Sequence, residues 1–114
     1  MTDFIIQKVI DHYRVSTYHM RSRNRDGEYV KARHLFFYLM REHTRATLND
    51  IGAVLSRDHA TVLHGWRSVK NQIELYSDFR KEIEPIQNVI RHMIAFRETA
   101  DEEMYMENDC YVNN

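Results

Sequence analysis

Two helical patterns joined by a very short connection constrain the fold of this chain more than any other feature. Apolar residues recur at three- and four-residue spacing over about 48–55 and again over about 59–75. Only Ser56 and Arg57 lie between the first pattern and Asp58, a residue type that favours the start of a helix. Two helices connected so closely predict a helix-turn-helix, which presents the N-terminal tip of its second helix.

The rest of the chain also follows helical spacing, over about 3–14, near 17–21, over about 29–43 and from about 79 to the mid-90s. Three glycines and one proline leave few of the breaks that a many-stranded sheet requires. We therefore predict one compact all-α domain, residues 1–97, with about five or six helices. The predicted caps are Thr2 or Asp3, Ser16, Thr47, Asp58 and Asp78. The predicted core is Ile5, Ile6, Val9, Ile10, Tyr13, Ala32, Leu35, Phe36, Leu39, Met40, Leu48, Ile51, Val54, Leu55, Val62, Trp66, Val69, Ile73, Phe79, Ile83, Ile86, Val89, Ile90 and Met93.

Two features near the C-terminus interrupt this pattern. Pro85 lies inside the last predicted helix, where proline removes a hydrogen bond, so we expect a kink or a break near 84–85. Residues 98–114 contain six acidic residues and no lysine or arginine. We predict that they form a disordered tail or a frayed helix.

The charge of the chain is unevenly distributed. Its formal net charge is −1, and leaving out the six acidic residues of 98–114 gives +5 for residues 1–97. That excess lies mainly in residues 14–45, which include the basic loop, residues 21–27, with no helical periodicity and with Arg21, Arg23 and Arg25. The local excess favours a nucleic-acid partner, which an overall charge of −1 would not indicate.

Composition excludes several other classes. A single cysteine, Cys110, allows no disulfide within the chain, and we find neither a signal peptide nor an apolar run that would span a bilayer. We therefore expect a cytoplasmic protein without a membrane partner. No nucleophile, base and orienting group stand together, and His59 and His64 do not share a helix face. We expect no catalytic residues, no metal site and no cofactor.

The tip of the second helix carries side chains suited to DNA. Asp58 can accept from a cytosine amino group, His59 can donate to a purine, and the methyl groups of Ala60 and Thr61 can contact thymine. A cationic arginine from a neighbouring loop can enter a narrow, A/T-rich minor groove, and Arg25 is the best placed for this. Arg23 and Arg21 would support Arg25 there. The expected phosphate contacts are Arg23, Lys31, Arg33, Arg41, Arg45, Arg57 and His64.

At this level of detail the chain resembles a known family. The string Thr47-Leu-Asn-Asp-Ile-Gly52 followed by Arg57-Asp-His-Ala-Thr-Val-Leu-His64 is similar to the C-terminal DNA-binding domain of DnaA, the bacterial replication initiator. The resemblance extends through Ala32-Arg33 and the basic loop, and covers about 5–95. It implies a helical fold of the Trp-repressor and DnaA C-terminal type, and binding to an A/T-rich DnaA box in duplex DNA.

The resemblance also implies roles for individual residues. Asp58, His59, Ala60 and Thr61 would read bases in the major groove, and Arg25 would lie in the minor groove. It places Arg33, His34, Arg41, Arg57 and His64 at or beside the DNA backbone. Ala60 stands where the family usually has threonine, Gly27 where a second basic loop residue is common, and the turn before Arg57 is one residue shorter.

The sequence contains no ATPase module or Walker motif, so we expect no nucleotide binding. Such a chain would occupy DnaA-box-like sites. It would regulate replication by competing with the full initiator, or mark an origin for a phage or mobile element, or repress a promoter, and these roles stay open. The alternative is a protein–protein interaction or transcription-regulator module on the same scaffold with weak DNA affinity. The acidic tail is either solvated filler or a competitor for the basic face, and the oligomeric state is open.

Overall fold

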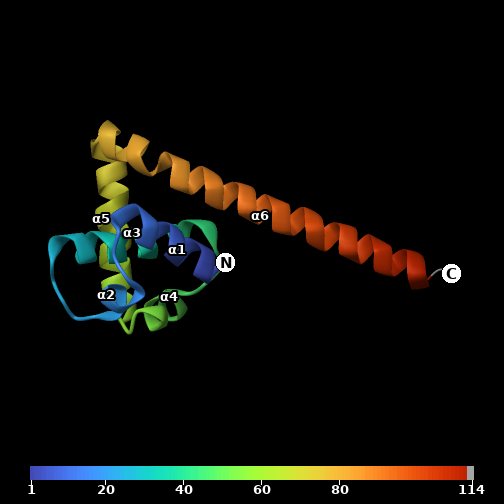
Figure 1. Cartoon of the computed structure of the whole chain (residues 1–114), viewed down its shortest axis with the longest axis horizontal. Coiled ribbons are helices and arrows are strands. Elements are labelled where there is room, and N and C mark those ends of the chain that lie inside the picture. The colour runs from blue at the N-terminus through green and yellow to red at the C-terminus, as the bar shows by residue number, and fades with distance from the viewer. Residues whose placement is uncertain (113–114) are drawn as a thin grey trace.

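The structure is a computed structural model that describes the backbone of residues 1–112 and the side chains of residues 1–98. Within that part of the chain the regular structure is entirely helical, which confirms the all-α prediction (Figure 1). The helices are α1 (Thr2–Tyr13), α2 (Thr17–Arg21), α3 (Gly27–His43), α4 (Leu48–Val54), α5 (His59–Leu75) and α6 (Ser77–Val112).

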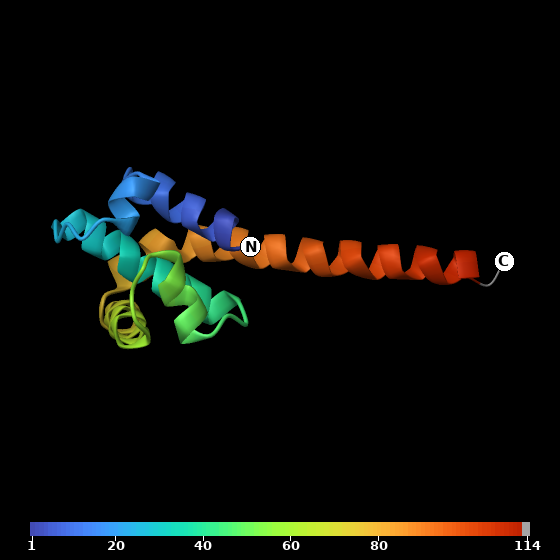
Figure 2. The same cartoon turned by 90° about the horizontal axis from the view of Figure 1, so that it is seen from below.

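Helix α3 forms the centre of the domain. Figure 2 shows α1 and α2 on one side of α3 and the pair α4–α5 on the other. An α-helix buried on both sides must be apolar around much of its circumference. The run from Leu35 to Met40 is accordingly buried throughout, including Phe37 and Tyr38, which lie outside the predicted stripe.

Most of the predicted core is confirmed. Thirteen of its members are buried: Ile5, Val9, Ala32, Leu35, Phe36, Leu39, Met40, Ile51, Leu55, Val62, Val69, Ile83 and Ile90. Trp66 is only half-buried but packs against this core. Val89 was predicted to be inside and is 42% exposed, because the stripe of α6 that faces the rest of the domain contains Ile83 and Ile90 but not Val89.

Side-chain caps start the helices at three predicted positions. Ser16 Oγ accepts from the backbone N–H of His19 at 3.1 Å, and Thr47 Oγ1 accepts from Asp50 at 3.1 Å. In both cases the third helical residue bonds back to the cap, which satisfies two free N–H groups at once. Asp58 caps α5 as predicted, and α1 has no side-chain cap at Met1.

The connection between α4 and α5 folds back on α4. Ser56 adopts a left-handed backbone with φ 56°, and Arg57 N donates to Gly52 O at 2.8 Å. A Cβ atom on Gly52 would stand only 2.3 Å from Arg57 O, so the tight turn requires glycine there. This close approach lets two helices join through so few residues, and it confirms the predicted helix-turn-helix.

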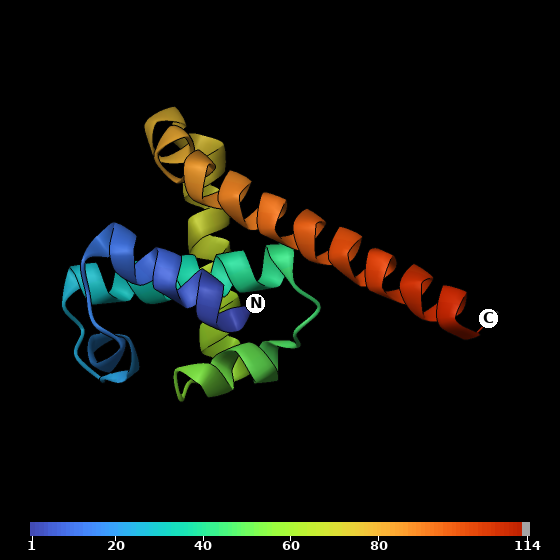
Figure 3. The same ribbon diagram turned by 45° about the vertical axis from the view of Figure 1, so that its right-hand side comes forward.

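Helix α6 is longer than expected. It begins at Ser77, directly after Tyr76, which ends α5, and it continues to Val112 rather than ending in the mid-90s. Figures 1 and 3 show its second half projecting beyond the other helices. Pro85 does not break the helix. The disorder predicted for 98–114 stays a prediction, since 113–114 and the side chains of 99–112 lie outside the described residues.

No helix within the described residues combines the length and the apolar character that crossing a bilayer would require.

Candidate nucleic-acid interface

The tip of α5 is a well-formed helix start open to solvent. Asp58 Oδ1 accepts from the backbone N–H of Thr61 at 2.8 Å, and this bond holds the pKa of the Asp58 carboxyl below its usual range. Asp58, His59, Ala60 and Thr61 are all exposed. The structure thus brings the four residues expected to read bases together on one accessible turn.

The outer face of α5 follows the predicted division. Val62 and Val69 are buried, whereas Ala60, His64, Arg67 and Asn71 are exposed. Gly65 lies against α3, where an added Cβ would stand 2.8 Å from a ring carbon of Phe37 and 2.9 Å from one of His34. This contact seats α5 closely on α3 and leaves its opposite face free for a partner.

The basic loop is short and ordered by its own side chains. Asn24 N donates to Ser22 Oγ at 3.3 Å, and Asp26 N donates to Asn24 Oδ1 at 2.9 Å. Asp26 in turn caps α3 through Glu28 N at 3.0 Å. Gly27 is already the first residue of α3, so the basic loop predicted over 21–27 ends one residue earlier, at the cap of that helix.

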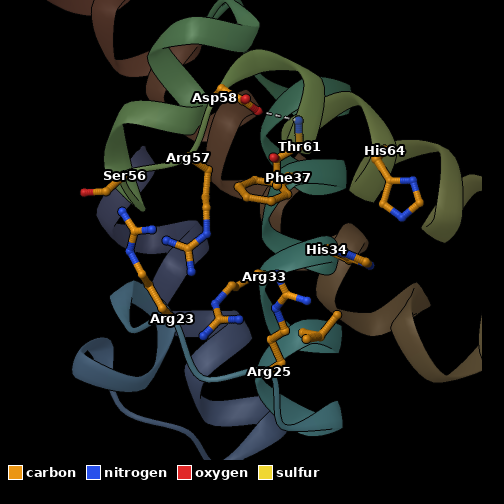
Figure 4. Close-up of a pocket in the computed structure, with 11 residues that line it drawn as sticks. Arg23, Arg25, Arg33, His34, Phe37, Ser56, Arg57, Asp58, Thr61 and His64 are labelled. Carbon is orange, nitrogen blue, oxygen red and sulfur yellow. Dashed lines mark hydrogen bonds between the residues drawn. The ribbon is translucent and has the colours of Figure 1, made fainter.

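The basic loop and the tip of α5 border one groove of about 750 Å³. Figure 4 shows arginine side chains converging between the loop and the α4–α5 turn. Asp58 is the one acidic side chain among the described residues that line it. Such a concentration of cations suits a phosphate-bearing ligand. The lining residues are Arg23, Arg25, Val30, Arg33, His34, Phe37, Ser56, Arg57, Asp58, Thr61 and His64.

Arg33 has a different environment from the one expected. It was placed at the DNA backbone, yet it is only 6% exposed. Its Nε donates to Met20 O at 2.9 Å, and its Nη2 donates to His19 O at 2.9 Å and Ser22 O at 2.8 Å. Burial and the neighbouring Arg57 lower the pKa of the Arg33 guanidinium. This geometry favours a structural role that fixes the end of α2, in place of a phosphate contact.

Arg57 is also engaged within the protein. Its Nη1 donates to Leu55 O at 2.7 Å, and its Nη2 donates to Ser22 O in the basic loop. Arg57 remains half-buried at the groove wall. Arg23 and Arg25, by contrast, are exposed side chains at the same groove.

Two histidines from different helices meet at the groove. The rings of His34 and His64 lie edge to face with their centroids 5.6 Å apart. Burial lowers the pKa of His34, and His64 and Arg33 add to that effect. His34 is half-buried and His64 is exposed, so the pair reaches the surface beside Thr61.

Arg41 and Arg45 lie outside this groove. Arg41 stacks on Trp66 with its guanidinium carbon 3.9 Å from the ring centroid, and Lys70 lies 4.9 Å from the same ring. Trp66 Nε1 donates to Glu42 Oε1 at 2.8 Å. Stacking of this kind orients a guanidinium while leaving its N–H groups available. Arg41 and Arg45 are both exposed.

Sequence reasoning missed three residues of the groove wall, Val30, Phe37 and Ser56. Phe37 follows Arg33 by four residues and therefore shares its helix face, which was the available signal. Val30 lies one turn before His34 for the same reason. No comparable pattern marks Ser56, whose place depends on the fold of the turn. No three His, Cys, Asp or Glu residues among the described side chains are grouped to hold a metal ion.

The fold and this groove define the class of protein: a helix-turn-helix domain of the DNA-binding kind. Residues 2–69 match the family described as the bacterial DnaA protein helix-turn-helix, and the chain belongs to that family. The match includes α1 to α4 and most of α5, and thus every residue that lines the groove.

Several chromosomal replication initiator proteins DnaA are similar to this chain. That of Chloroflexus aggregans is 38% identical over 90 residues, which cover 78% of this chain and 19% of the relative. Those of Porphyromonas gingivalis and Bacteroides fragilis are 37% identical over 87 residues and 34% identical over 90 residues. These alignments cover 75% and 78% of this chain, and 18% and 19% of the relatives. The chain therefore spans about a fifth of the length of each of these relatives.

Proposed function

We propose that this chain binds duplex DNA specifically at A/T-rich sites of the DnaA-box type. The observation that carries the proposal is the shared groove, in which the loop arginines Arg23 and Arg25 stand opposite Asp58 and Thr61 of the α5 tip. One stretch of duplex can then meet the tip of α5 in its major groove and the basic loop in the adjacent minor groove.

Each part of this interface has its own chemical task. Asp58 accepts from a cytosine amino group, His59 donates to a purine, and the methyl groups of Ala60 and Thr61 pack on thymine. Arg25 enters the minor groove, where A/T-rich DNA has its most negative potential. Phosphate contacts come from Arg23, His34, Arg41, Arg45 and His64. Arg57 lies at the wall of the same groove, beside these contacts.

The cellular role follows from occupancy of such sites. We infer that the chain regulates or marks the initiation of DNA replication in the cytoplasm, in competition with a full-length initiator for the same boxes. The relatives named above are replication initiators, which supports this assignment. The partner is duplex DNA, and the proposal requires no nucleotide cofactor, membrane or catalytic step.

A titration tests the binding itself. A labelled duplex with an A/T-rich DnaA box and a scrambled duplex of equal composition are compared by fluorescence anisotropy at one moderate salt concentration. We expect a Kd well below about 1 µM for the box and binding at least about 100-fold weaker for the scrambled duplex. Equal, feeble binding to both would favour the alternative, a protein–protein interaction module on the same scaffold.

A second titration tests the competition. A full-length initiator is bound to a labelled box, and this chain is added at increasing concentration. We expect displacement at concentrations above its own Kd for the box, which rise in proportion to the initiator concentration, since both proteins need the same base edges. Simultaneous binding of both proteins to one box would contradict the competitive role.

A further inference from the structure

The carbonyl oxygen of Ser22 accepts hydrogen bonds from two guanidinium groups that belong to different elements. Arg33 of α3 donates to it from Nη2 at 2.8 Å. Arg57, in the turn between α4 and α5, donates to it from Nη2 as well. Arg57 also donates from Nη1 to Leu55 O at 2.7 Å, within its own turn. One side chain thus links the turn of the helix-turn-helix directly to the start of the basic loop.

This link holds two cations side by side without a carboxylate between them. The acceptors are backbone carbonyls at the C-terminal end of α2, from His19, Met20 and Ser22, where the helix carries partial negative charge. Ser22 Oγ donates to His19 O at 2.9 Å and closes the same cluster. The position of Ser22 is therefore fixed by several bonds, but only Arg57 connects it to the α4–α5 turn among the hydrogen bonds described.

The fixed point at Ser22 limits where the loop arginines can reach. Arg25 follows Ser22 by three residues, which span at most about 10 Å of extended chain. Asp26, the next residue, caps α3 and fixes the other end. Arg57 itself directly precedes Asp58, the first residue of the α5 tip. The bond from Arg57 to Ser22 therefore sets the separation between the loop arginines and the residues at the tip.

We propose that Arg57 is a positioning residue that sets the spacing between the minor-groove contact and the major-groove contact, and so selects the length of the DNA element. This inference rests on the proposed function. One inserted base pair moves the two halves of a site apart by about 3.4 Å and rotates them by about 35°. A loop held to the turn cannot follow that change, whereas a released loop can follow it in part.

The test compares two duplexes and four proteins. One duplex carries the A/T-rich box, and the other carries the same box with one base pair inserted between the A/T-rich half and the adjoining half. The proteins are the wild type, Arg57→Ala, Arg57→Lys and, as a control, Arg45→Ala, which removes an exposed arginine outside the groove. Circular dichroism and thermal unfolding establish that each variant is folded, and a scrambled duplex is titrated alongside.

We expect the wild type to bind the inserted site about tenfold or more weakly than the box. Arg57→Ala should bind the box with about tenfold lower affinity than the wild type, and its affinities for the two sites should differ by less than about threefold. Arg57→Lys keeps the charge but not the planar fork that reaches two carbonyls, so it should not restore the discrimination. Arg45→Ala should weaken binding to both sites by the same factor, so the ratio of the two Kd values should equal that of the wild type.

Other outcomes would overturn the inference. If Arg57→Ala keeps the wild-type ratio and Arg57→Lys recovers the affinity, Arg57 is a phosphate contact and does not set the spacing. If the wild type prefers the box over the scrambled duplex but tolerates the insertion, only the spacing role is overturned. Equal binding of box and scrambled duplex by the wild type would overturn the proposed function, and the spacing role with it.

Discussion

Arg25 and Arg21 differ in environment although both are exposed arginines of the basic loop. Arg25 lines the groove beside the α5 tip, whereas Arg21 ends α2 outside it. We predict that Arg25→Ala weakens binding to the box by about 1–3 kcal/mol, since a minor-groove contact to an A/T-rich element is lost. Anisotropy titrations with box and scrambled duplex measure this.

The matched control is Arg21→Ala, which removes the same charge from the same loop. It should weaken binding to the box and to the scrambled duplex by similar amounts, each smaller than the effect of Arg25→Ala on the box. If the two variants behave alike on both duplexes, Arg25 contributes charge alone and does not select A/T-rich DNA.

We predict that His34 makes the stability of the fold depend on pH. Its pKa is lowered from 6.5 in the folded chain, first by burial and then by His64 and Arg33. The unfolded chain therefore takes up a proton more readily, so the free energy of unfolding should fall as pH decreases below about 6.5. The loss should level off below the folded pKa. Burial also lowers the pKa of His43, which adds a loss of the same sign.

The measurement is urea unfolding between pH 7.5 and about 5. His34→Gln should show a smaller loss than the wild type, because the substituted side chain does not titrate. His43→Gln should also show a smaller loss than the wild type, because burial lowers the pKa of His43 as well. A loss of equal size in His34→Gln would exclude His34 as its source.

The burial of Arg33 could not be predicted from the sequence. Its spacing from Ala32 and Phe36 did not distinguish an exposed cation from a buried one, since arginine is mostly exposed in proteins. The carbonyls that accept its hydrogen bonds lie 11 to 14 residues earlier in the chain. Such partners come together only through the tertiary fold, which a local pattern does not encode.

At the scale of elements, the connection between α4 and α5 depends on Gly52. A Cβ there would stand 2.3 Å from Arg57 O, and backbone cannot move away as cheaply as a flexible side chain. We predict that Gly52→Ala lowers the free energy of unfolding by about 2–3 kcal/mol, despite the better helix propensity of alanine. Box affinity should fall as well, because Arg57 moves with the turn.

Gly27 provides a control with the same substitution in a different environment. It lies in the first turn of α3 with nothing within 4 Å of an added Cβ. Gly27→Ala should therefore change the free energy of unfolding by less than about 1 kcal/mol, and in the stabilising direction. Denaturant unfolding of both variants makes the comparison. If Gly52→Ala is as stable as Gly27→Ala, the tight contact does not control the turn.

The helices could be predicted from the sequence because caps and apolar stripes are defined by residues close together in the chain. Ser16, Thr47 and Asp58 cap helices as expected, and the apolar stripes of α3 and α5 face the core. Apolar stripes and caps lie within one or two helical turns, so sequence alone contains them. The candidate base-reading residues follow from the same logic, since they occupy one turn after a cap.

What could not be predicted depends on distant contacts. The anchoring of the start of the basic loop depends on Ser22 O, which accepts from Arg33 and Arg57, 11 and 35 residues later in the chain. The continuity of α6 is a similar case, because Pro85 predicted a kink or a break near 84–85 and the helix runs unbroken through it. Proline removes its own N–H donor and its ring crowds the carbonyl one turn earlier. Ile83 and Ile90, on either side of Pro85, are both buried in the core and hold the helix in place.

At the scale of the whole molecule, the acidic residues near the C-terminus follow the residues that form the core. Among the side chains that the structure describes, Ile90 is the last that is fully buried, and Ile94 is the last that packs against the core. The six acidic residues of 98–114 follow beyond that point. A chain that ends at residue 97 should therefore retain the fold, with a free energy of unfolding within about 0.5 kcal/mol of the full chain.

The same truncation should change DNA binding through charge. It raises the formal net charge from −1 to +5, so the phosphates repel the protein less. We predict tighter binding to box and scrambled duplex alike at about 0.05 M salt. The difference should shrink at about 0.2 M salt, because screening shortens the range of charge–charge interactions.

A full-length variant separates the charge of the tail from its length. In this variant the six acidic residues of the tail are replaced by the corresponding amides, which keeps the length of the chain and removes the negative charge. These residues are Glu98, Asp101, Glu102, Glu103, Glu107 and Asp109. It should bind DNA as tightly as the truncated chain if repulsion is the cause. If truncation tightens binding and the amide variant does not, the tail acts by covering the groove. If neither variant changes the affinity at low salt, the acidic tail is filler and the charge balance of residues 1–97 alone governs binding.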